Sequence, residues 1–446
     1  MKRIAAVAIA GAALLCTLSV QSVQAQIRGE IIGAGARLIP IAVPALKRTG
    51  DMTSDRAARR FIEVLRGDLE LSGIFRVIDP AAYIDDPQTS GLTRDTVNFE
   101  NWRSVGAMTL IRGSVKGTGS DLAVEVRVFD VADHSSSGGR RMSGSTTQTA
   151  RMAHRMADTV LEYLTGIHGP FDSRLAFVSN RGGHVREIYT YSFDGEVKKV
   201  TNHRSITMAP SWHPSAQALL FTSFRSRAPV LYSLDLRTGY DSRLASKLGV
   251  NVGGSYSPDG SRVLLARESN GNTDIHELDP SRGKVRPLTT HWAIDVDPGW
   301  APDGRRIVFC SSRSGTPQVY SMSIGGSDLR RLTFDGNYNC SPVWSPDGKH
   351  IAFAGQSNGR FQIYVMPAEG GSPRQLTFSG SNEDPTWSPD SRYLAYSGKR
   401  GGRRKIYMID MHGRRERQLT DGSSDDSSPS WSRRLEYRAK RTNLSR

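Results

Sequence analysis

The stretch PVWSPDGKHIAFAGQSNGRFQIYVMPAEGGSPRQLT, residues 342–377, contains four short apolar runs separated by turn residues. Ser345-Pro346-Asp347-Gly348 suits a type I turn, because proline presets φ at its second position and glycine tolerates the exit. Gly370-Gly371 can form the turn between the last two runs in the same way. A proline is tolerated at the start of a strand, and the aromatic residue two positions later can pack between neighbouring sheets. The stretch therefore predicts four antiparallel strands.

The same unit recurs along the second half of the chain, and its aromatic residues are 44, 44, 44, 43 and 44 positions apart. The six openings are Pro210-Ser211-Trp212, Gly254-Ser255-Tyr256, Pro298-Gly299-Trp300, Pro342-Val343-Trp344, Pro385-Thr386-Trp387 and Pro429-Ser430-Trp431. Four-stranded units of about 40 to 45 residues are typical of WD40-like β-propeller blades, which close into a ring and so leave few free sheet edges.

The two ends of the repeat region predict how the ring closes. Leu175 to Phe177, Glu187 to Tyr189 and Lys199 to Thr201 have the pattern of second, third and fourth strands without a first. Pro429 to Ser432 supplies a first strand with nothing after it. Pairing the C-terminal strand with this incomplete blade predicts six blades.

The region before Gly169 has a mixed pattern that predicts an α/β domain. Its expected elements are a strand at 39–43, a helix from Ser54 to Leu71 that ends at Gly73, a strand at 75–78, paired strands at 108–115 and 122–131, and a helix at 149–165 that ends at Gly166. The predicted divisions are an N-terminal domain with a mobile tail at 26–168, a propeller at 169–433 and a basic C-terminal tail at 434–446.

The first 25 residues have the features of a secretory signal peptide. Lys2 and Arg3 precede an apolar run over residues 4–20, and Val23-Gln24-Ala25 resembles a cleavage site. A membrane anchor needs about twenty apolar residues, and this run is shorter. We therefore expect export, cleavage near Gln26, and no membrane insertion afterwards.

The formal net charge of +15 raises the question of nucleic-acid binding. No interleaving of aromatic and basic residues and no groove-reading helix accompanies it, so no nucleic-acid partner is expected. Gly355-Gln356-Ser357-Asn358-Gly359 matches the nucleophile elbow of hydrolases, but that elbow needs a following helix, whereas this stretch joins two propeller strands. Histidines lack zinc spacing and the aspartates form no complete calcium loop, so we expect no enzyme activity, metal or cofactor.

One face of the ring should carry the longer and more varied loops. If first strands line the channel, the Ser-Pro-Asp-Gly turns lie on one face and the connections between blades lie on the other, here called the varied face. Acidic and amide side chains are expected near the channel mouth on this face: Asn251, Asp295, Asp297, Asn337, Asn339, Asn382, Glu383, Asp384, Asp425 and Asp426. Arginines are expected farther out: Arg225, Arg227, Arg313, Arg360 and Arg400. Such loops carry function on propellers, so we predict a partner site there.

With a signal peptide, an α/β domain and six blades in this order, the chain resembles the TolB family, the periplasmic components of the Tol–Pal system. The specific stretches are Phe61 to Leu65 leading to Asp68 to Phe75, Trp102 with Gly106-Ala107, and the join from Leu164 to Phe171. The resemblance implies an adaptor that binds Pal, the peptidoglycan-associated lipoprotein, on a propeller face and helps the outer membrane stay intact and constrict at division. It also implies that TolA binds the mature N-terminal tail: Gln26, Ile27, Arg28, Gly29, Glu30, Ile31 and Ile32. Other envelope proteins are further expected partners.

Two alternatives from other classes remain open at this stage. A propeller hydrolase or lyase would need convergent titratable groups in the channel. A peptidoglycan-binding module would be favoured if exposed aromatic side chains crowded the varied face. The pattern shows mainly Asn, Asp and Arg there, which favours protein recognition.

Two cysteines of the mature chain are candidates for a disulfide. Cys310 ends a second strand, and Cys340 lies just before the first strand of the next blade, so both belong to the same face of adjacent blades. Export to an oxidising compartment permits the bond. The Cα atoms must lie about 5.5 Å apart, which the sequence leaves open.

Overall fold

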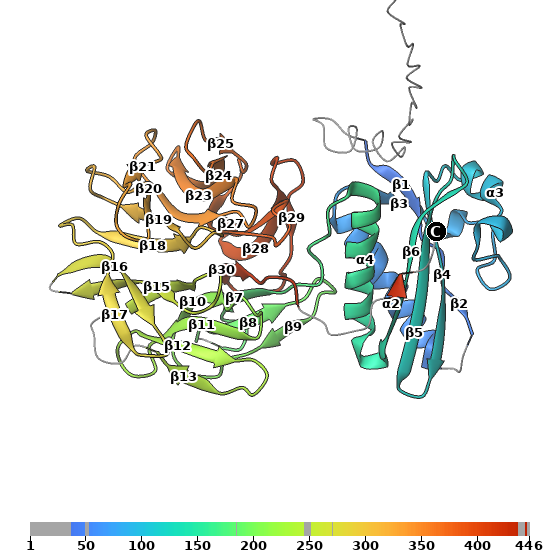
Figure 1. Cartoon of the computed structure of the whole chain (residues 1–446), viewed down its shortest axis with the longest axis horizontal. Coiled ribbons are helices and arrows are strands. Elements are labelled where there is room, and N and C mark those ends of the chain that lie inside the picture. Colours follow the sequence, from blue (N-terminus) through green and yellow to red (C-terminus); the bar gives the residue numbers. More distant parts are fainter. Residues whose placement is uncertain are drawn as a thin grey trace, which may run out of the picture. The chain divides into compact units, whose positions relative to one another are not determined.

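The computed structural model describes residues 37–49, 53–183, 185–244, 251–269, 271–435 and 442–443. An α/β domain is followed by a six-bladed β-propeller, so the predicted fold class is confirmed (Figure 1). The expected signal peptide and the tail at 26–33 lie outside the described residues. Within these ranges no helix is long and apolar enough to cross a membrane.

The sheet of the α/β domain has the order β3-β1-β4-β5-β6-β31, and β2 pairs with β4. β1 runs parallel to β3 and β4, whereas β4, β5 and β6 form an antiparallel meander. The strands are β1 (Ile39–Ala42), β2 (Lys47–Arg48), β3 (Phe75–Val77), β4 (Thr109–Thr118), β5 (Asp121–Asp130), β6 (Ser135–Ser145) and β31 (Thr442–Asn443).

Two long helices cover this sheet. α2 (Thr53–Leu71) and α4 (Thr149–Thr165) pack against each other, and their apolar faces share one core with the sheet. Each is followed by a glycine with a left-handed backbone, Gly73 (φ 67°) and Gly166 (φ 73°), as the sequence predicts. The shorter helices are η1 (Pro80–Ala82), η2 (Arg94–Thr96), α3 (Phe99–Ser104) and η3 (Thr146–Gln148).

The propeller consists of six four-stranded sheets. Five of them take their strands in chain order: β10 (Thr207–Trp212), β11 (Ala218–Ser223), β12 (Val230–Asp235), β13 (Asp241–Arg243); β14 (Asn251–Tyr256), β15 (Val263–Ser269), β16 (Asn272–Asp279), β17 (Lys284–Pro287); β18 (Asp295–Trp300), β19 (Arg306–Ser311), β20 (Gln318–Ser323), β21 (Arg330–Arg331); β22 (Asn339–Trp344), β23 (His350–Ser357), β24 (Arg360–Pro367), β25 (Arg374–Gln375); and β26 (Ser381–Trp387), β27 (Tyr393–Arg400), β28 (Arg403–Asp410), β29 (Arg417–Gln418).

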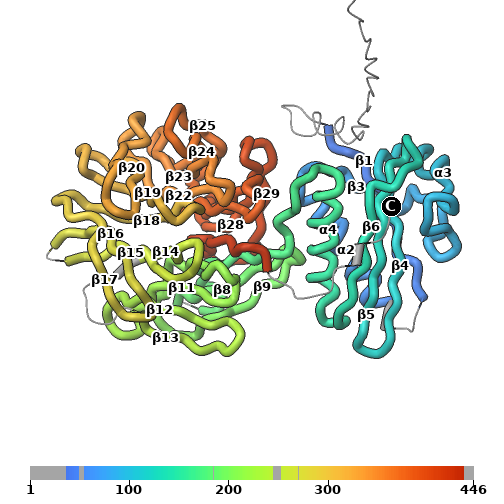
Figure 2. The backbone as a smooth tube through the Cα atoms, viewed as in Figure 1, coloured from blue at the N-terminus to red at the C-terminus, as the bar shows by residue number. Residues whose placement is uncertain are grey.

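The sixth sheet joins the two ends of the repeat region. Its order is β30-β7-β8-β9, with β30 (Asp426–Trp431), β7 (Leu175–Ser179), β8 (Glu187–Tyr191) and β9 (Val197–Lys199). Asp426 pairs with Ser179 and Trp431 with Leu175, so the first strand of this sheet comes from the C-terminal end of the ring. The backbone trace accordingly returns to the start of the propeller (Figure 2).

The repeated tryptophans tie neighbouring blades together. The indole N–H of Trp212 donates to the carbonyl of Ser430 at 3.0 Å, and that of Trp300 donates to Ser255 at 3.1 Å. Trp387 donates to the carbonyl of Val343 in the same way, at 3.2 Å. Each ring therefore fills the space between two sheets and satisfies its one polar atom there.

Candidate functional site: the channel and the varied face

Each first strand of the six sheets contains a β-bulge, where the pairing register shifts. The bulge lies three residues before the repeated aromatic and has a left-handed backbone with φ between 49° and 65°. The six bulge residues are Ala209, Gly253, Asp297, Ser341, Asp384 and Ser428. A bulge re-aims a side chain, and here all six residues line one cavity of about 490 Å³ in the centre of the ring.

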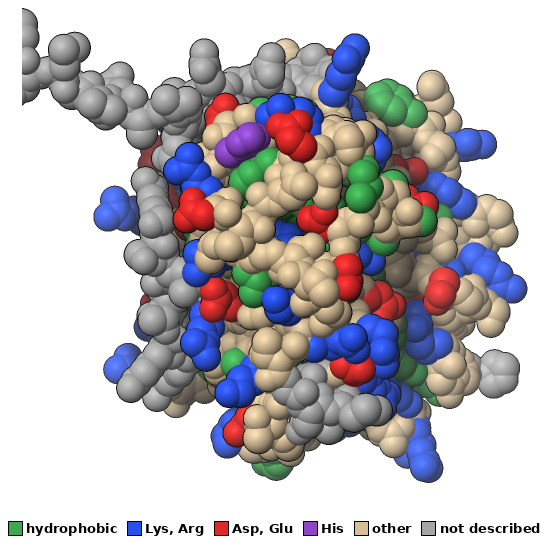
Figure 3. Space-filling model, turned by 90° about the vertical axis from the view of Figure 1, so that its right-hand side faces the viewer, with side chains coloured by type: hydrophobic (Ala, Val, Ile, Leu, Met, Phe, Trp, Pro, Cys, Tyr) green, Lys and Arg blue, Asp and Glu red, His purple; other side chains and the backbone are tan. Residues whose placement is uncertain are grey.

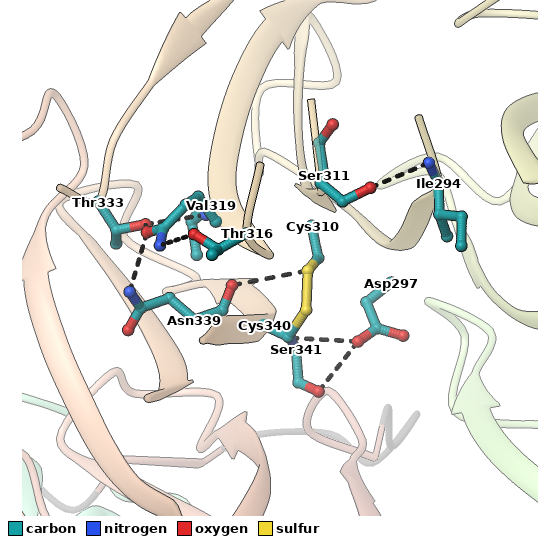
Figure 4. The surroundings of a disulfide bond; sticks show 12 residues. Ile294, Asp297, Cys310, Ser311, Thr316, Val319, Thr333, Asn339, Cys340 and Ser341 are labelled. Carbon is teal, nitrogen blue, oxygen red and sulfur yellow. Dashed lines mark hydrogen bonds between the residues drawn. A yellow bond between two sulfur atoms is a disulfide. The ribbon is translucent and has the colours of Figure 1, made fainter. Parts of the chain in front are cut away.

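Asp297 projects into this cavity and bonds to the next blade. Its Oδ2 accepts hydrogen bonds from the backbone N–H and the hydroxyl of Ser341, at 3.1 and 3.0 Å (Figure 4). The side chain is open to the channel, yet the propeller surrounds it. This desolvation raises the pKa of the Asp297 carboxyl, and the hydrogen bonds from Ser341 only partly offset it.

Asp384 occupies the same position two blades along the chain. Its Oδ2 accepts from the hydroxyls of Ser428 at 3.1 Å and Ser397 at 3.3 Å. Desolvation raises the pKa of the Asp384 carboxyl, and the negative charges of Asp297 and Glu383 raise it further. Neither Asp297 nor Asp384 forms an ion pair within the described part of the chain. Glu268 lines the cavity as well, so three carboxylates face it, and Arg404 only partly lowers the pKa of Asp384.

The prediction for the channel mouth is wrong at four residues, which are buried inside their own blades: Asp295, Asn339, Asn382 and Asp426. Asp295, Asn339 and Asn382 have 0%, 5% and 0% of their surface exposed. The amide of Asn339 donates to Gln318, and that of Asn382 donates to Gln362, both at 2.9 Å. The prediction was wrong because these residues lie five positions before the repeated aromatic residue. They precede the bulge, where the side chain faces into the blade.

The prediction of an outer ring of arginines is also wrong in part, because several of these side chains bond to acceptors within their own blades. Arg313 pairs with Asp295 at 2.8 Å. Arg400 donates to Asn382 at 3.0 Å, and Arg225 makes two 2.8 Å bonds to Asp241. Asp426, expected on the face, is fully buried between Arg181 and Lys405. Asp295, Asp426 and the arginines bound to buried acceptors stabilise the blades, whereas Arg225 remains exposed at the surface.

The other predicted residues lie on the surface. Asn337, Asp425, Arg227 and Arg360 are exposed, and Glu383 is half-buried and pairs with Arg404 at 3.0 Å. Glu383, Asp384 and Asp425 line a polar hollow of about 350 Å³. For Asn251 the structure describes only the backbone, at the start of β14.

Cys310 and Cys340 form a disulfide between adjacent blades, with their Cα atoms 5.1 Å apart (Figure 4). Cys310 belongs to β19 and Cys340 to β22, next to the bulge residue Ser341. The bond therefore ties together the two blades that supply Asp297 and its hydrogen-bond donor.

The sequence interpretation missed a set of exposed apolar side chains on the varied face. They lie in the connections between blades: Trp292, Ile294, Phe334, Tyr338 and Phe378. Ile206 occupies a similar place before β10. A signal was present in the repeat, because Phe334 and Phe378 each follow a Leu-Thr pair at the end of a fourth strand.

Charges elsewhere on the molecule are mixed in sign. On the side that faces the viewer in Figure 3, which is the side of α3 and β4, basic side chains alternate with acidic ones. Among the described residues, no group of three His, Cys, Asp or Glu side chains is arranged to hold a metal ion.

These features define a two-domain β-propeller protein with a carboxylate-lined channel. A family model for the TolB beta propeller domain matches residues 161–435, and one for the TolB amino-terminal domain matches residues 27–136. The chain therefore belongs to the TolB family.

Individual relatives agree with this assignment. The Tol-Pal system protein TolB of Syntrophotalea carbinolica is 41% identical over 209 residues, which are 47% of this chain and 48% of the relative. That of Bordetella pertussis is 34% identical over 248 residues, 54% of each chain. The matched region thus spans about half the length of these curated relatives. The crystal structure of TolB from Acinetobacter baumannii aligns with a TM-score of 0.78 and 26% identity, covering 89% of this chain and 97% of that one.

Proposed function

We propose that this protein is a non-enzymatic periplasmic adaptor of the Tol–Pal system. In this role the propeller binds Pal on its varied face, and the mature N-terminus binds TolA. The two contacts support outer-membrane integrity and constriction during cell division. The names of the relatives support membership of the system, and the geometry of the channel supports the position of the Pal contact.

One observation carries the Pal contact: Asp297 and Asp384 face one central cavity, and neither forms an ion pair within the described ranges. Like charges in a poorly hydrated space are unfavourable until a donor or a cationic group arrives. A partner that brings basic or hydrogen-bond-donating groups to the channel mouth would relieve this cost. Complementary charge would also speed the encounter and set the register of the complex.

Charge reversal in the channel tests this proposal. We expect Asp297→Lys and Asp384→Lys each to weaken Pal binding at least tenfold, because the new ammonium group repels the basic surface that the site should attract. Circular dichroism should show an unchanged fold, and calorimetric titration with purified Pal measures the affinity. Asp303→Lys, in an exposed turn between the first two strands of its blade, is the control. If both channel variants bind Pal like the wild type, the contact lies elsewhere.

The proposed TolA contact is tested by removing residues 26–33. An extended terminal segment can add to the sheet edge of a partner through backbone hydrogen bonds. The truncated protein should fold normally, lose TolA binding and keep Pal binding. Unchanged affinity for TolA in a pull-down with purified components would show that the tail is not the contact.

A further inference from the structure

Large apolar side chains are strongly exposed along one part of the varied face. Trp292, Phe334 and Phe378 have 77%, 70% and 76% of their surface exposed, and Ile294 and Tyr338 have 55% and 37%. We call these five residues the apolar arc. Large apolar side chains that stay exposed in neighbouring loops of one face are a mark of contact sites.

The arc belongs to three consecutive connections between blades. Trp292 and Ile294 lie between β17 and β18, Phe334 and Tyr338 between β21 and β22, and Phe378 between β25 and β26. All three connections lead into first strands, so they lie on the face where the channel opens to the varied loops. Tyr338 also packs edge-on against Phe361, with the ring centroids 5.2 Å apart, which extends the apolar surface toward the next blade.

The blade architecture explains why these side chains point outward. A threonine ends the fourth strand and folds inward: the Thr333 hydroxyl accepts from Val319 N–H and donates to Gln318, and Thr377 bonds to Ile363 and Gln362 in the same way. The residue after each threonine is therefore the first one outside the blade. A phenylalanine at this position contributes nothing to the core.

Among the described connections between blades, the one between β29 and β30 does not continue the apolar arc. The connection between β29 and β30 has no exposed large apolar residue, and it presents Asp421 and Asp425 instead. Next to it lies the polar hollow with Glu383 and Asp384. Arg186, Lys399 and Arg404 line this hollow too, so the channel mouth has an apolar side and a side of mixed charge.

We propose that the apolar arc is the anchoring surface for a protein partner that sits off the propeller axis. This partner packs aromatic or aliphatic side chains on Trp292, Phe334 and Phe378. It directs a basic group toward the carboxylates of Asp297 and Asp384 in the channel. The inference rests on the proposed function, and it adds the position and the chemistry of the Pal contact.

The chemistry of the arc favours a protein over other ligands. Aromatic residues and arginine dominate the energetic centres of protein interfaces, and the guanidinium of Arg331 lies 5.1 Å from the centre of the Phe334 ring. An anionic lipid surface would meet Asp335 directly beside Phe334, and the channel carboxylates beyond it. The exposed rings of Trp292, Phe334 and Phe378 also meet the condition stated above for a glycan-binding module, so the test below includes peptidoglycan as a competing ligand.

The test compares single and triple alanine variants in the full mature chain. Trp292→Ala, Phe334→Ala and Phe378→Ala should each weaken Pal binding about tenfold or more, as truncation of a central anchor does. Tyr240→Ala is the matched control, because Tyr240 is 72% exposed but lies in a turn between third and fourth strands, on the opposite face. It should change the affinity less than twofold. Exposed side chains contribute little to stability, so all variants should fold, which circular dichroism checks.

The outcomes separate this inference from the function on which it rests. If the wild type binds Pal and the triple variant binds equally well, the anchoring surface is overturned while the adaptor function stands. If the wild type does not bind Pal at all, the proposed function itself fails. Sedimentation with vesicles of phosphatidylethanolamine and phosphatidylglycerol, and with purified peptidoglycan, completes the test. The wild type could co-sediment with vesicles or peptidoglycan while the triple variant does not, and Pal binding could be the same for both. That result would assign the arc to a lipid or a glycan instead.

Discussion

Asp426→Ala should lower the free energy of unfolding by about 3–5 kcal/mol, because it breaks a buried ion pair and leaves cations without a counterion. The Asp426 carboxylate accepts from the Ser179 hydroxyl at 2.5 Å and from Arg181 at 2.9 Å. Lys405, which is 5% exposed, lies 3.3 Å away on the neighbouring blade. One carboxylate thus holds the closing strand β30, its partner hairpin and the adjacent sheet together.

Urea denaturation followed by circular dichroism measures this effect. Asp425→Ala is the matched control, since Asp425 is the preceding residue and is exposed, and it should cost less than about 1 kcal/mol. Asp426→Asn keeps the shape and the acceptor for Ser179 but removes the charge, so it should fall between the two. Equal losses for Asp425→Ala and Asp426→Ala would mean that the ion pairs contribute nothing to ring closure.

The fold could be predicted from the sequence because the residues that specify each blade are close together in the chain and recur from blade to blade. The Ser-Pro-Asp-Gly turn, the aromatic residue and the Leu-Thr pair recur in register, and each has a local physical reason. The unpaired first strand at Trp431 then indicated the number of blades. Strand β6 was missed, because residues 135–145 are rich in serine and glycine and become a strand only through pairing with β5.

The channel residues were only partly predictable, because a bulge changes which side of the strand a residue faces. Simple alternation places Asp295 and Asp297 on the same side of β18. The left-handed backbone at Asp297 (φ 51°) breaks this alternation, so that Asp297 faces the channel while Asp295 is buried. Charge and loop composition cannot reveal such a rotation. The recurring proline one residue later is the feature that could have located it.

A second buried ionic cluster joins the α/β domain to the propeller. His154 of α4 places Nδ1 2.7 Å from Asp68 of α2, and its Nε2 lies 3.9 Å from Asp194, in the turn between β8 and β9. Arg60 of α2 also pairs with Asp194, at 2.9 Å. The propeller thus contributes one carboxylate to a cluster whose other members come from two helices.

The charge state of this cluster follows from its surroundings. Burial by itself would lower the pKa of His154, but the negative charges of Asp68 and Asp194 outweigh it and raise the pKa to about 10. The nearby imidazolium of His154 is the main cause that lowers the pKa of Asp194, to about 2. At neutral pH an imidazolium therefore lies between two carboxylates.

His154→Gln should cost about 3–5 kcal/mol near pH 6.5, because it leaves Asp68, which is 1% exposed, without its cation. The pKa of His154 is higher in the folded than in the unfolded chain. Its stabilisation is therefore complete below about pH 6.5 and is lost as the pH rises toward 10. Burial raises the pKa of Asp68 to about 6, so without His154 this carboxyl would itself hold a proton, and the double variant His154→Gln/Asp68→Asn removes both titrating groups. The difference in stability between the wild type and this double variant should shrink steadily across this window.

Urea midpoints at pH 6.5, 8 and 9.5 for the wild type, His154→Gln/Asp68→Asn and His412→Gln measure this linkage. His412 is exposed, and its lowered pKa places its titration below the window, so its variant should follow the wild type throughout. Lysines and tyrosines also titrate at high pH, but they are common to all three proteins and cancel in the differences. A stability difference that stays constant from pH 6.5 to 9.5 would show that His154 is neutral when folded. The cluster would then join the two domains by packing and hydrogen bonding, and the charge of the imidazole would play no part.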